Sequence, residues 1–392
     1  IKPKKKKQQM KSGKINLLAL VLEKYNKPLN KKKISFFNNV NSQIFILFGI
    51  ITCASLFSDL YFENYSLTIP FIITALISSF ITYISIPILK KIKIQQIIRE
   101  EGPKKHYIKQ GTPTMGGVFF IPIAIIIANI LFLKSQDYRI ILTLSLLIIS
   151  FMLIGLIDDL ISLKKKFNTG LTSNQKLIFQ FFISLIFIIF CESNNFLSSN
   201  IQIANRIINI ENLIYPLGIF VLLAESNSTN LTDGLDGLLS GCSALIFTGL
   251  AITILVENQA YAETLAPLCI VMAGSSMGFL VLNKHPAKLF MGDSGSLAIG
   301  ASLGGIALIS NNLWSLLVMG GVLAAESISV ITQVGIFKIS KKIKGKGHKL
   351  FLMTPIHHHF ELKGNKETHI VSSFWFVTLL LIIINLVFFA KS

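Results

Sequence analysis

The sequence is poor in charge, and above all in acidic residues. Only 14% of its 392 residues are charged, and 19 aspartates and glutamates stand against 37 lysines and arginines. With so few charged side chains, a soluble domain of this length could not cover the 52% of residues that are hydrophobic. The composition therefore excludes an ordinary soluble protein.

Cysteine is also scarce, and no two cysteines have the CxxC spacing of a zinc or redox motif. The four are Cys53, Cys191, Cys242 and Cys269. Each lies in or beside an apolar run, so we expect packed thiols rather than disulfides. A cleavable signal peptide is not expected, because the N-terminal stretch is too rich in lysine.

Long apolar runs are what the sequence has in abundance. Runs of roughly 15–23 residues recur with almost no charge, and about 20 such residues cross a bilayer as a helix. Backbone polar groups in lipid must bond within their own segment, which favours helices over open strands. We therefore predict an all-α polytopic membrane protein with about eleven transmembrane helices. The predicted segments are 43–60, 68–89, 115–133, 139–157, 175–191, 212–225, 238–256, 264–282, 296–310, 312–337 and 371–390.

The positions of lysine and arginine predict which connections face the cytoplasm. With a cytoplasmic N-terminus and alternating spans, 33 of the 37 basic residues fall in five inside segments. These segments are 1–42, 90–114, 158–176, 283–295 and 338–370. The same topology places the C-terminus outside, and an even number of spans would reverse the C-terminal half.

The chain divides into three regions. Residues 1–42 form a basic cytoplasmic tail that we expect to be disordered. Residues 43–67 hold one transmembrane helix and a loop, and residues 68–392 form the main transmembrane domain. The net charge of +18 indicates membrane topology and attraction to anionic lipid. Nucleic acid is not an expected partner, because the basic residues do not alternate with aromatic residues on a polar face.

Two acidic motifs follow apolar runs on the predicted cytoplasmic side. Asp158 and Asp159 are adjacent, and a divalent cation would offset their repulsion and dehydration; an ordinary helix end in water is the alternative. The stretch 227–238 carries polar residues at every third position, which a helix would spread over half its surface and a tight turn would gather. These residues are Asn227, Asn230, Asp233 and Asp236. A surface turn needs only one capping residue, so four favour a functional site.

A third acidic loop and a set of lysines complete the pattern. Asp293 lies in the segment FMGDSGS. Carboxylates from several loops, without cysteine, suit Mg²⁺, which takes its remaining oxygens from phosphates. The lysines that suit a phosphate or diphosphate are Lys109, Lys164, Lys165, Lys166 and Lys176. Acidic and basic groups on one face predict metal-assisted phosphoryl transfer.

Three consecutive histidines, His357, His358 and His359, precede the last apolar run. Consecutive positions of a regular element cannot all face one ion, so a three-histidine zinc site is disfavoured. We expect one or two of them to hydrogen-bond a phosphate or a base, and a solvated loop is the alternative.

Taken together, the motifs KQGTPTMGG, DD after a span, NLTDGLDG, FMGDSGSL and PIHHHFELKG resemble those of the phospho-N-acetylmuramoyl-pentapeptide-transferase (MraY) family. Their order and spacing are similar over about residues 70–392, which the resemblance identifies as a transmembrane transferase domain. It implies transfer of phospho-MurNAc-pentapeptide from UDP-MurNAc-pentapeptide to undecaprenyl phosphate with Mg²⁺, giving lipid I and UMP. It also implies a cytoplasmic site in the plasma (inner) membrane and a role in peptidoglycan synthesis.

The resemblance also implies residue roles. The catalytic residues it implies are Asp158, Asp159, Asp293, His357 and His358, with Asp293 as the Mg²⁺ ligand. The substrate-binding residues it implies are Lys109, Thr112, Thr114, Lys166, Lys176, Asn227, Asn230, Asp233, Asp236, Asn283, Phe290 and His359. Among these, Asp233 and Asn283 are expected on the uracil side, and Phe290 is expected to stack on the base.

Two departures and several alternatives stay open. Ser162 stands where the family often has lysine, and about 68 residues precede the family-like region. The donor could be another UDP-sugar such as UDP-GlcNAc. A secondary transporter would use intramembrane acids, of which Glu326 is the main example. A direct displacement and a two-step route through a phospho-aspartate are both compatible with the sequence, as are a homodimer and a bacterial or plastid host.

Overall fold

The apolar runs fold into α-helices, as the need for internal backbone hydrogen bonds in lipid requires. The computed structural model describes residues 40–62, 66–92, 94, 109, 111–165, 170–203, 206–258 and 261–388. The basic tail expected over 1–42 therefore lies outside the described residues, except for residues 40–42 at the start of the first described helix. Residues Gln43–Ser392 form a compact unit of their own.

Helices make up nearly all of this unit. They are α2 (Val40–Tyr61), α3 (Thr68–Lys91), α4 (Gly117–Phe132), α5 (Tyr138–Lys165), α6 (Ser173–Ser193), α7 (Ile214–Thr232), α8 (Leu238–Val256), α9 (Ala262–Asn283), α10 (Asp293–Ile309), α11 (Leu313–Met319), α12 (Gly321–Lys344), α13 (Ile356–Leu362) and α14 (Glu367–Phe388). Between α6 and α7 lie two short antiparallel strands, β1 (Asn200–Ile203) and β2 (Arg206–Asn209), and the 3₁₀ turn Glu211–Leu213.

The predicted all-α polytopic membrane fold is confirmed. Among the described residues, eight helices are long and apolar enough to cross a membrane, and α4 and α10 are shorter apolar helices. Every predicted apolar segment falls on a helix, but three differ clearly from their expected bounds. The fourth and the sixth continue to Lys165 and Thr232, eight and seven residues beyond their predicted ends, and the tenth is interrupted at Gly320 between α11 and α12.

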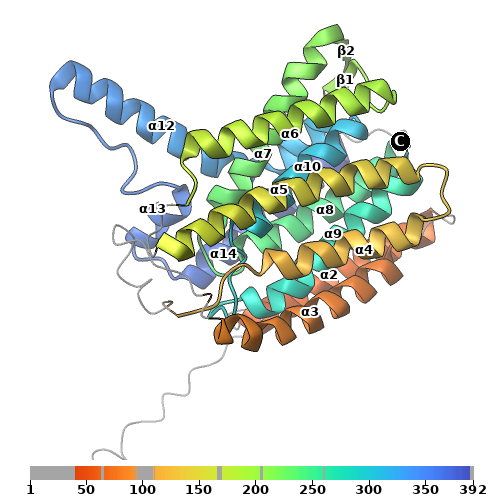
Figure 1. Cartoon of the computed structure of the whole chain (residues 1–392), viewed down its shortest axis with the longest axis horizontal. Helices are drawn as coiled ribbons and strands as arrows, with labels where there is room; N and C mark the ends of the chain where they lie inside the picture. Colours follow the sequence, from red (N-terminus) through yellow and green to blue (C-terminus); the bar gives the residue numbers. More distant parts are fainter. Residues whose placement is uncertain are drawn as a thin grey trace, which may run out of the picture. The chain divides into compact units, whose positions relative to one another are not determined.

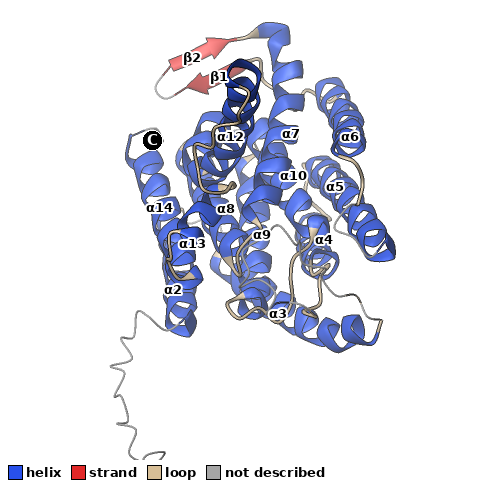
Figure 2. Ribbon diagram, turned by 90° about the vertical axis from the view of Figure 1, so that its left-hand side faces the viewer, coloured by secondary structure: helices blue, strands red, loops and turns tan. Residues whose placement is uncertain are grey.

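Helices α8, α9 and α10 form the centre, because almost all of their side chains are buried. A helix that is apolar all round must be surrounded by other helices or by lipid. The outer helices α3 and α6 instead carry exposed isoleucines, leucines and phenylalanines, the side chains suited to contact lipid. Figure 1 shows α5 running between α4 and α6, and the C-terminal part of α12 projecting away from the other helices. Figure 2 shows α13 beside α14.

A close approach between α5 and α10 sets the position of the acidic motifs. A Cβ atom at Gly155 would overlap the carbonyl group of Asp293 and the backbone nitrogen of Ser294. Only glycine permits helix backbones to pack at this separation. The first turn of α10 is consequently held against α5 three residues before Asp158.

Candidate active site

The acidic centre joins the end region of α5 to the beginning of α10. The carboxylate of Asp159 accepts hydrogen bonds from the backbone N–H groups of Asp293 and Ser294, each at 3.1 Å. A carboxylate in this place satisfies unpaired donors at a helix N-terminus and opposes the positive end of its dipole. Asp159 therefore fixes the first turn of α10, and with it the carboxylate of Asp293.

One lysine connects two of these acids. The capping box formed by Thr172 and Gln175 starts α6 and brings Lys176 into its first turn. Lys176 Nζ lies 2.5 Å from Asp293 Oδ2 and 3.3 Å from Asp158 Oδ1. Asp158 Oδ1 also accepts from the backbone N–H of Leu171 at 2.9 Å. Because the ammonium group offsets the repulsion between the two carboxylates, they can share one partly exposed site.

The polar residues of 227–238 are gathered only in part. Since α7 continues to Thr232, Asn227 and Asn230 lie on a helix and face different partners. Asn230 Nδ2 donates to Asp293 Oδ1 at 2.8 Å, whereas Asn227 Nδ2 donates to Gln180 Oε1 at 2.8 Å. The expectation that a turn gathers all four residues is therefore wrong for Asn227, which follows the helical spread.

Asp233 ends α7 and faces the acidic centre. Burial raises its pKa well above the ordinary aspartate value, and the negative charges of Asp293 and Asp159 raise it further. Its carboxylate forms no hydrogen bond with another side chain or backbone group of the described residues. Such a group either keeps its proton or pairs with a cation. Asp233 therefore makes binding of a cation at this site more favourable.

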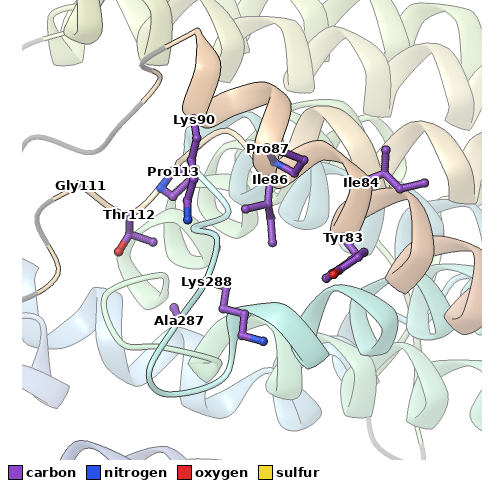
Figure 3. Close-up of a pocket in the computed structure, with 10 residues that line it drawn as sticks. All are labelled: Tyr83, Ile84, Ile86, Pro87, Lys90, Gly111, Thr112, Pro113, Ala287 and Lys288. Atoms are coloured by element: carbon purple, nitrogen blue, oxygen red, sulfur yellow. The ribbon is translucent and has the colours of Figure 1, made fainter.

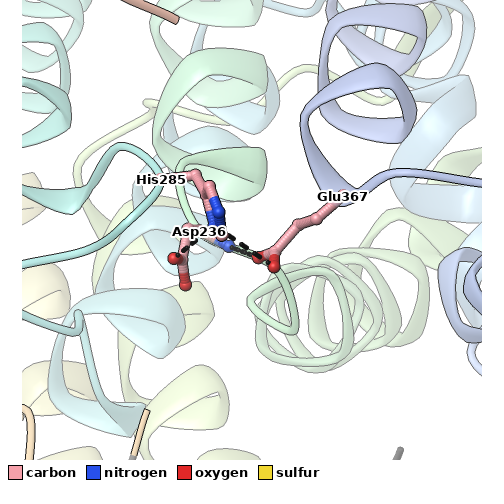
Figure 4. Close-up of side chains that lie close together, drawn as sticks. All are labelled: Asp236, His285 and Glu367. Carbon is pink, nitrogen blue, oxygen red and sulfur yellow. Dashed lines mark hydrogen bonds and ion pairs between the residues drawn. The ribbon is translucent and has the colours of Figure 1, made fainter. Parts of the chain in front are cut away.

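A second polar cluster lies beside the first. Lys109 Nζ is 2.7 Å from Asp236 Oδ1 and 2.6 Å from Glu367 Oε1. His285 Nδ1 is 3.1 Å from Asp236 Oδ2 and 3.3 Å from Glu367 Oε2. Figure 4 shows Asp236, His285 and Glu367 pointing toward one another. The backbone N–H groups of Asp236 and Ala287 also donate to Glu367 and Asp236, respectively.

The charges within this cluster reinforce one another. Hydrogen bonds to Asp236 and Glu367 raise the pKa of His285 to about 9. Burial lowers the pKa of Lys109, but the neighbouring carboxylates outweigh it and the pKa is raised. Burial likewise opposes ionisation of Asp236, yet His285 and Lys109 hold its pKa below the ordinary value. At neutral pH the cluster therefore contains two cations and two anions.

The same cluster is the one group of three potential metal ligands among the described residues, with ligand atoms within 4.8 Å of one another. Lys109 already bonds both of its carboxylates, and a protonated His285 has no lone pair for a metal. We therefore interpret the group as an ion-pair network and not as a metal centre.

The three histidines have three different partners. His357 is fully buried, and its Nδ1 lies 3.1 Å from Oε1 of the equally buried Glu326. His358 Nδ1 lies 2.8 Å from Glu361 Oε2. His359 Nδ1 accepts the backbone N–H of Leu352 at 3.2 Å. Glu326, the intramembrane acid singled out in the sequence, is thus paired with His357 inside the bundle.

Two neighbouring loops carry most of the remaining predicted residues. The N–H of Phe290 donates to Pro113 O, and the N–H of Gly116 donates to Phe290 O, both at 2.9 Å. Thr112 and Thr114 lie on one of these loops and Phe290 on the other. Asn283 is buried, accepts from Gly237 N and Ser240 Oγ, and donates to Leu289 O. These bonds give Asn283 a positioning role at the start of the loop, while Lys166 lies outside the described residues.

His285, Glu367 and Gln180 were not predicted as site residues. Each is a single polar residue next to or within an apolar segment, without a repeated spacing. Glu367 gave the best available signal, because it is the acidic residue at the start of the last apolar run.

An apolar helical bundle whose helix ends gather carboxylates, amides and lysines defines a membrane-embedded enzyme of the phosphoryl-transfer type. Residues 141–311 match the family described as glycosyl transferase family 4, and residues 109–121 match phospho-N-acetylmuramoyl-pentapeptide-transferase signature 1. The chain is 72% identical to the phospho-N-acetylmuramoyl-pentapeptide-transferase of Prochlorococcus marinus strain NATL2A, over 95% of this chain and 100% of the relative. It is 46% identical to that of Synechococcus sp. strain CC9605, over 87% of this chain and 98% of the relative. The chain belongs to the phospho-N-acetylmuramoyl-pentapeptide-transferase family.

Proposed function

We propose that the protein transfers phospho-MurNAc-pentapeptide from UDP-MurNAc-pentapeptide to undecaprenyl phosphate, releasing UMP and forming lipid I for peptidoglycan synthesis. The family membership supports the substrates. The observation that carries the proposal is the placement of Asp158 and Asp293 on either side of Lys176, because it combines acidic and basic groups at one point. Phosphoryl transfer requires such a site to position two phosphates and to stabilise the charge that moves between them.

Asp293 fits the role of a Mg²⁺ ligand. Its side chain is one quarter exposed, and a cation already lies against it, because Lys176 Nζ contacts both Asp293 Oδ2 and Asp158 Oδ1. Mg²⁺ would take the place of this ammonium group beside the carboxylate of Asp293. Mg²⁺ takes few protein carboxylates and fills its coordination with water and substrate phosphates. When bound, the ion would neutralise negative charge on the diphosphate.

In the reaction we propose, an oxygen of the lipid phosphate attacks the phosphorus that carries the sugar. The bond from that phosphorus to the bridging oxygen breaks, and UMP leaves. Asp158 serves as base or positioning group for the lipid phosphate, and Lys176 pairs with phosphate oxygens. Incubation with the nucleotide sugar alone distinguishes the routes, because an aspartate that carries phospho-MurNAc-pentapeptide, detected by mass spectrometry together with released UMP, would contradict direct displacement.

We place the site on the cytoplasmic side of the plasma membrane, with the N-terminus inside and the C-terminus outside. The distribution of 33 of 37 basic residues supports this orientation. The backbone hydrogen bonds between Pro113 and Phe290 are consistent with it, because they require the segments 90–114 and 283–295 to lie on the same side.

The central experiment measures UMP release from UDP-MurNAc-pentapeptide and undecaprenyl phosphate, with and without Mg²⁺. We expect the wild-type protein to require Mg²⁺ and the Asp293→Asn variant to lose at least about 100-fold in rate. UDP-GlcNAc serves as the comparison donor. Equal rates for the wild type and the variant, or faster transfer from UDP-GlcNAc, would contradict the proposal.

A further inference from the structure

A pocket of about 730 Å³ lies between the last turns of α3 and the two loops that adjoin the candidate active site. Figure 3 shows Lys90 and Tyr83 extending from α3 toward the space beside the loop that carries Lys288. Thr112 and Ala287 belong to the facing loops. None of the three acidic-centre residues, Asp158, Asp159 and Asp293, lines this pocket.

One wall of the pocket is apolar and continues onto the outer surface of α3. Tyr83 and Ile84 are 61% and 45% exposed, and Ile86 and Pro87 extend the same wall. Helix α3 is one of the candidate membrane spans, and only about a third of its apolar stretch is buried inside the protein. A large apolar surface on such a helix faces lipid acyl chains, so the pocket opens toward the bilayer.

The polar end of the pocket is cationic. Lys90 lies in the last turn of α3 and Lys288 lies across the pocket from it (Figure 3), and neither lysine forms an ion pair with a carboxylate of the described residues. Burial and, after it, the charge of Lys288 lower the pKa of the neighbouring Lys284. The hydroxyl of Thr112 adds a hydrogen-bond donor at the same end.

We propose that this pocket binds an anionic bilayer lipid, with the headgroup phosphate between Lys90 and Lys288 and an acyl chain along Tyr83 and Ile84. Two ammonium groups at the interface beside an apolar wall complement a charged headgroup attached to a hydrocarbon chain. A free nucleotide phosphate would leave the apolar wall exposed.

A bound lipid would connect α3 to the active-site loops. The backbone N–H of Ala287 donates to Asp236 at 3.0 Å, and Pro113 accepts from Phe290 at 2.9 Å. The pocket walls are thus the outer sides of the loops that carry the ion-pair network. The lipid holds both loops against α3, and transfer is faster in membranes that contain it.

The test uses the full chain in nanodiscs of phosphatidylcholine with and without phosphatidylglycerol. Native mass spectrometry counts the phosphatidylglycerol molecules that stay bound to the released protein. We expect the Lys90→Gln/Lys288→Gln variant to retain one fewer than the wild type and to bind phosphatidylglycerol about tenfold more weakly or worse. The matched control, Lys341→Gln/Lys342→Gln, removes the same charge from the exposed end of α12 and should retain the wild-type number.

Equal retention by the wild type and the pocket variant would overturn the proposal. A variant that keeps its phosphatidylglycerol but loses bound undecaprenyl phosphate would also overturn it, because the pocket would then belong to the acceptor. Thermal unfolding in neutral nanodiscs checks that the variant is folded. Lipid counting needs no catalysis, so failure of the proposed transfer reaction would leave this result unaffected.

Discussion

At the scale of single residues, the site depends on cations placed between carboxylates. Lys176 bridges Asp158 and Asp293 in the acidic centre, and Lys109 bridges Asp236 and Glu367 in the neighbouring network. A carboxylate that loses its only cation at a partly buried place either takes up a proton or repels its neighbours. The ionisation of the acidic centre therefore depends on Lys176, whereas in the neighbouring network Lys109 shares this role with His285.

Replacing Lys176 by glutamine tests the acidic centre. The variant leaves Asp158 and Asp293 without their shared cation and removes a partner for substrate phosphate, so we expect transfer to fall at least about 100-fold. UMP release is the measurement. Lys134→Gln removes the same charge from an exposed position between α4 and α5, and it should change the rate less than about twofold. Equal losses in the two variants would show that Lys176 acts only through net charge.

His285 gives the ion-pair network a pH dependence. Its pKa is raised from 6.5 to about 9 by Asp236 and Glu367, with Lys109 as the other charged group facing it. A raised histidine pKa stabilises the folded protein fully below pH 6.5, and this contribution is lost as the pH rises through 9. The wild type should therefore unfold at a higher temperature than His285→Gln at pH 7 and lose that advantage above about pH 9. An advantage that grows with pH would contradict this assignment.

Sequence patterns predicted some of these residues and missed others for a physical reason. Asp158, Asp159 and Asp293 stand out because charge beside an apolar run is costly unless it has a function. Neither His285 nor Glu367 belongs to a motif of regularly spaced polar residues. Their pairing depends on how α14 packs beside the loop after α9. Contacts between segments so far apart in the chain come from packing, which local patterns do not encode.

At the scale of elements, the active site depends on how closely α5 and α10 pack. The apolar runs located the long helices, but they missed the short α13 and placed the end of α7 at 225, because polar Asn227 and Asn230 looked like loop residues. They remain helical because they bond Gln180 and Asp293 inside the bundle. The break at Gly320 was also missed, since both sides of it are apolar.

The contact at Gly155 yields a direct test of this packing. Alanine there would overlap the backbone of Asp293 and Ser294, so we expect Gly155→Ala to destabilise the protein by about 1–3 kcal/mol and to reduce transfer. Thermal unfolding and UMP release measure the two effects. Gly335→Ala is the matched control, because a Cβ atom there meets no atom within 4 Å and alanine favours a helix. A variant at Gly155 as stable and active as this control would contradict the packing argument.

At the scale of the whole molecule, the distribution of charge and the positions of the loops favour one orientation in the membrane. The hairpin of β1 and β2 follows α6, and the positive-inside rule places it outside. The turn at Asn365, between α13 and α14, is placed inside by the same rule. The proposed chemistry needs this arrangement, because a nucleotide sugar made in the cytoplasm must reach the loops that carry Lys109 and Asp293.

Single cysteines introduced at these two places test the orientation in intact cells. Asn209 and Asn365 are both exposed, and the exposed native thiol is first removed by Cys53→Ser. A membrane-impermeant maleimide added from outside should label Asn209→Cys and leave Asn365→Cys unlabelled until the membrane is opened. Since both positions lie on the surface of the same folded chain, unequal labelling reports their side and not their accessibility. Labelling of Asn365→Cys in sealed cells would place the active-site loops outside, where UDP-linked substrate is not supplied, and would refute the proposed orientation and reaction together.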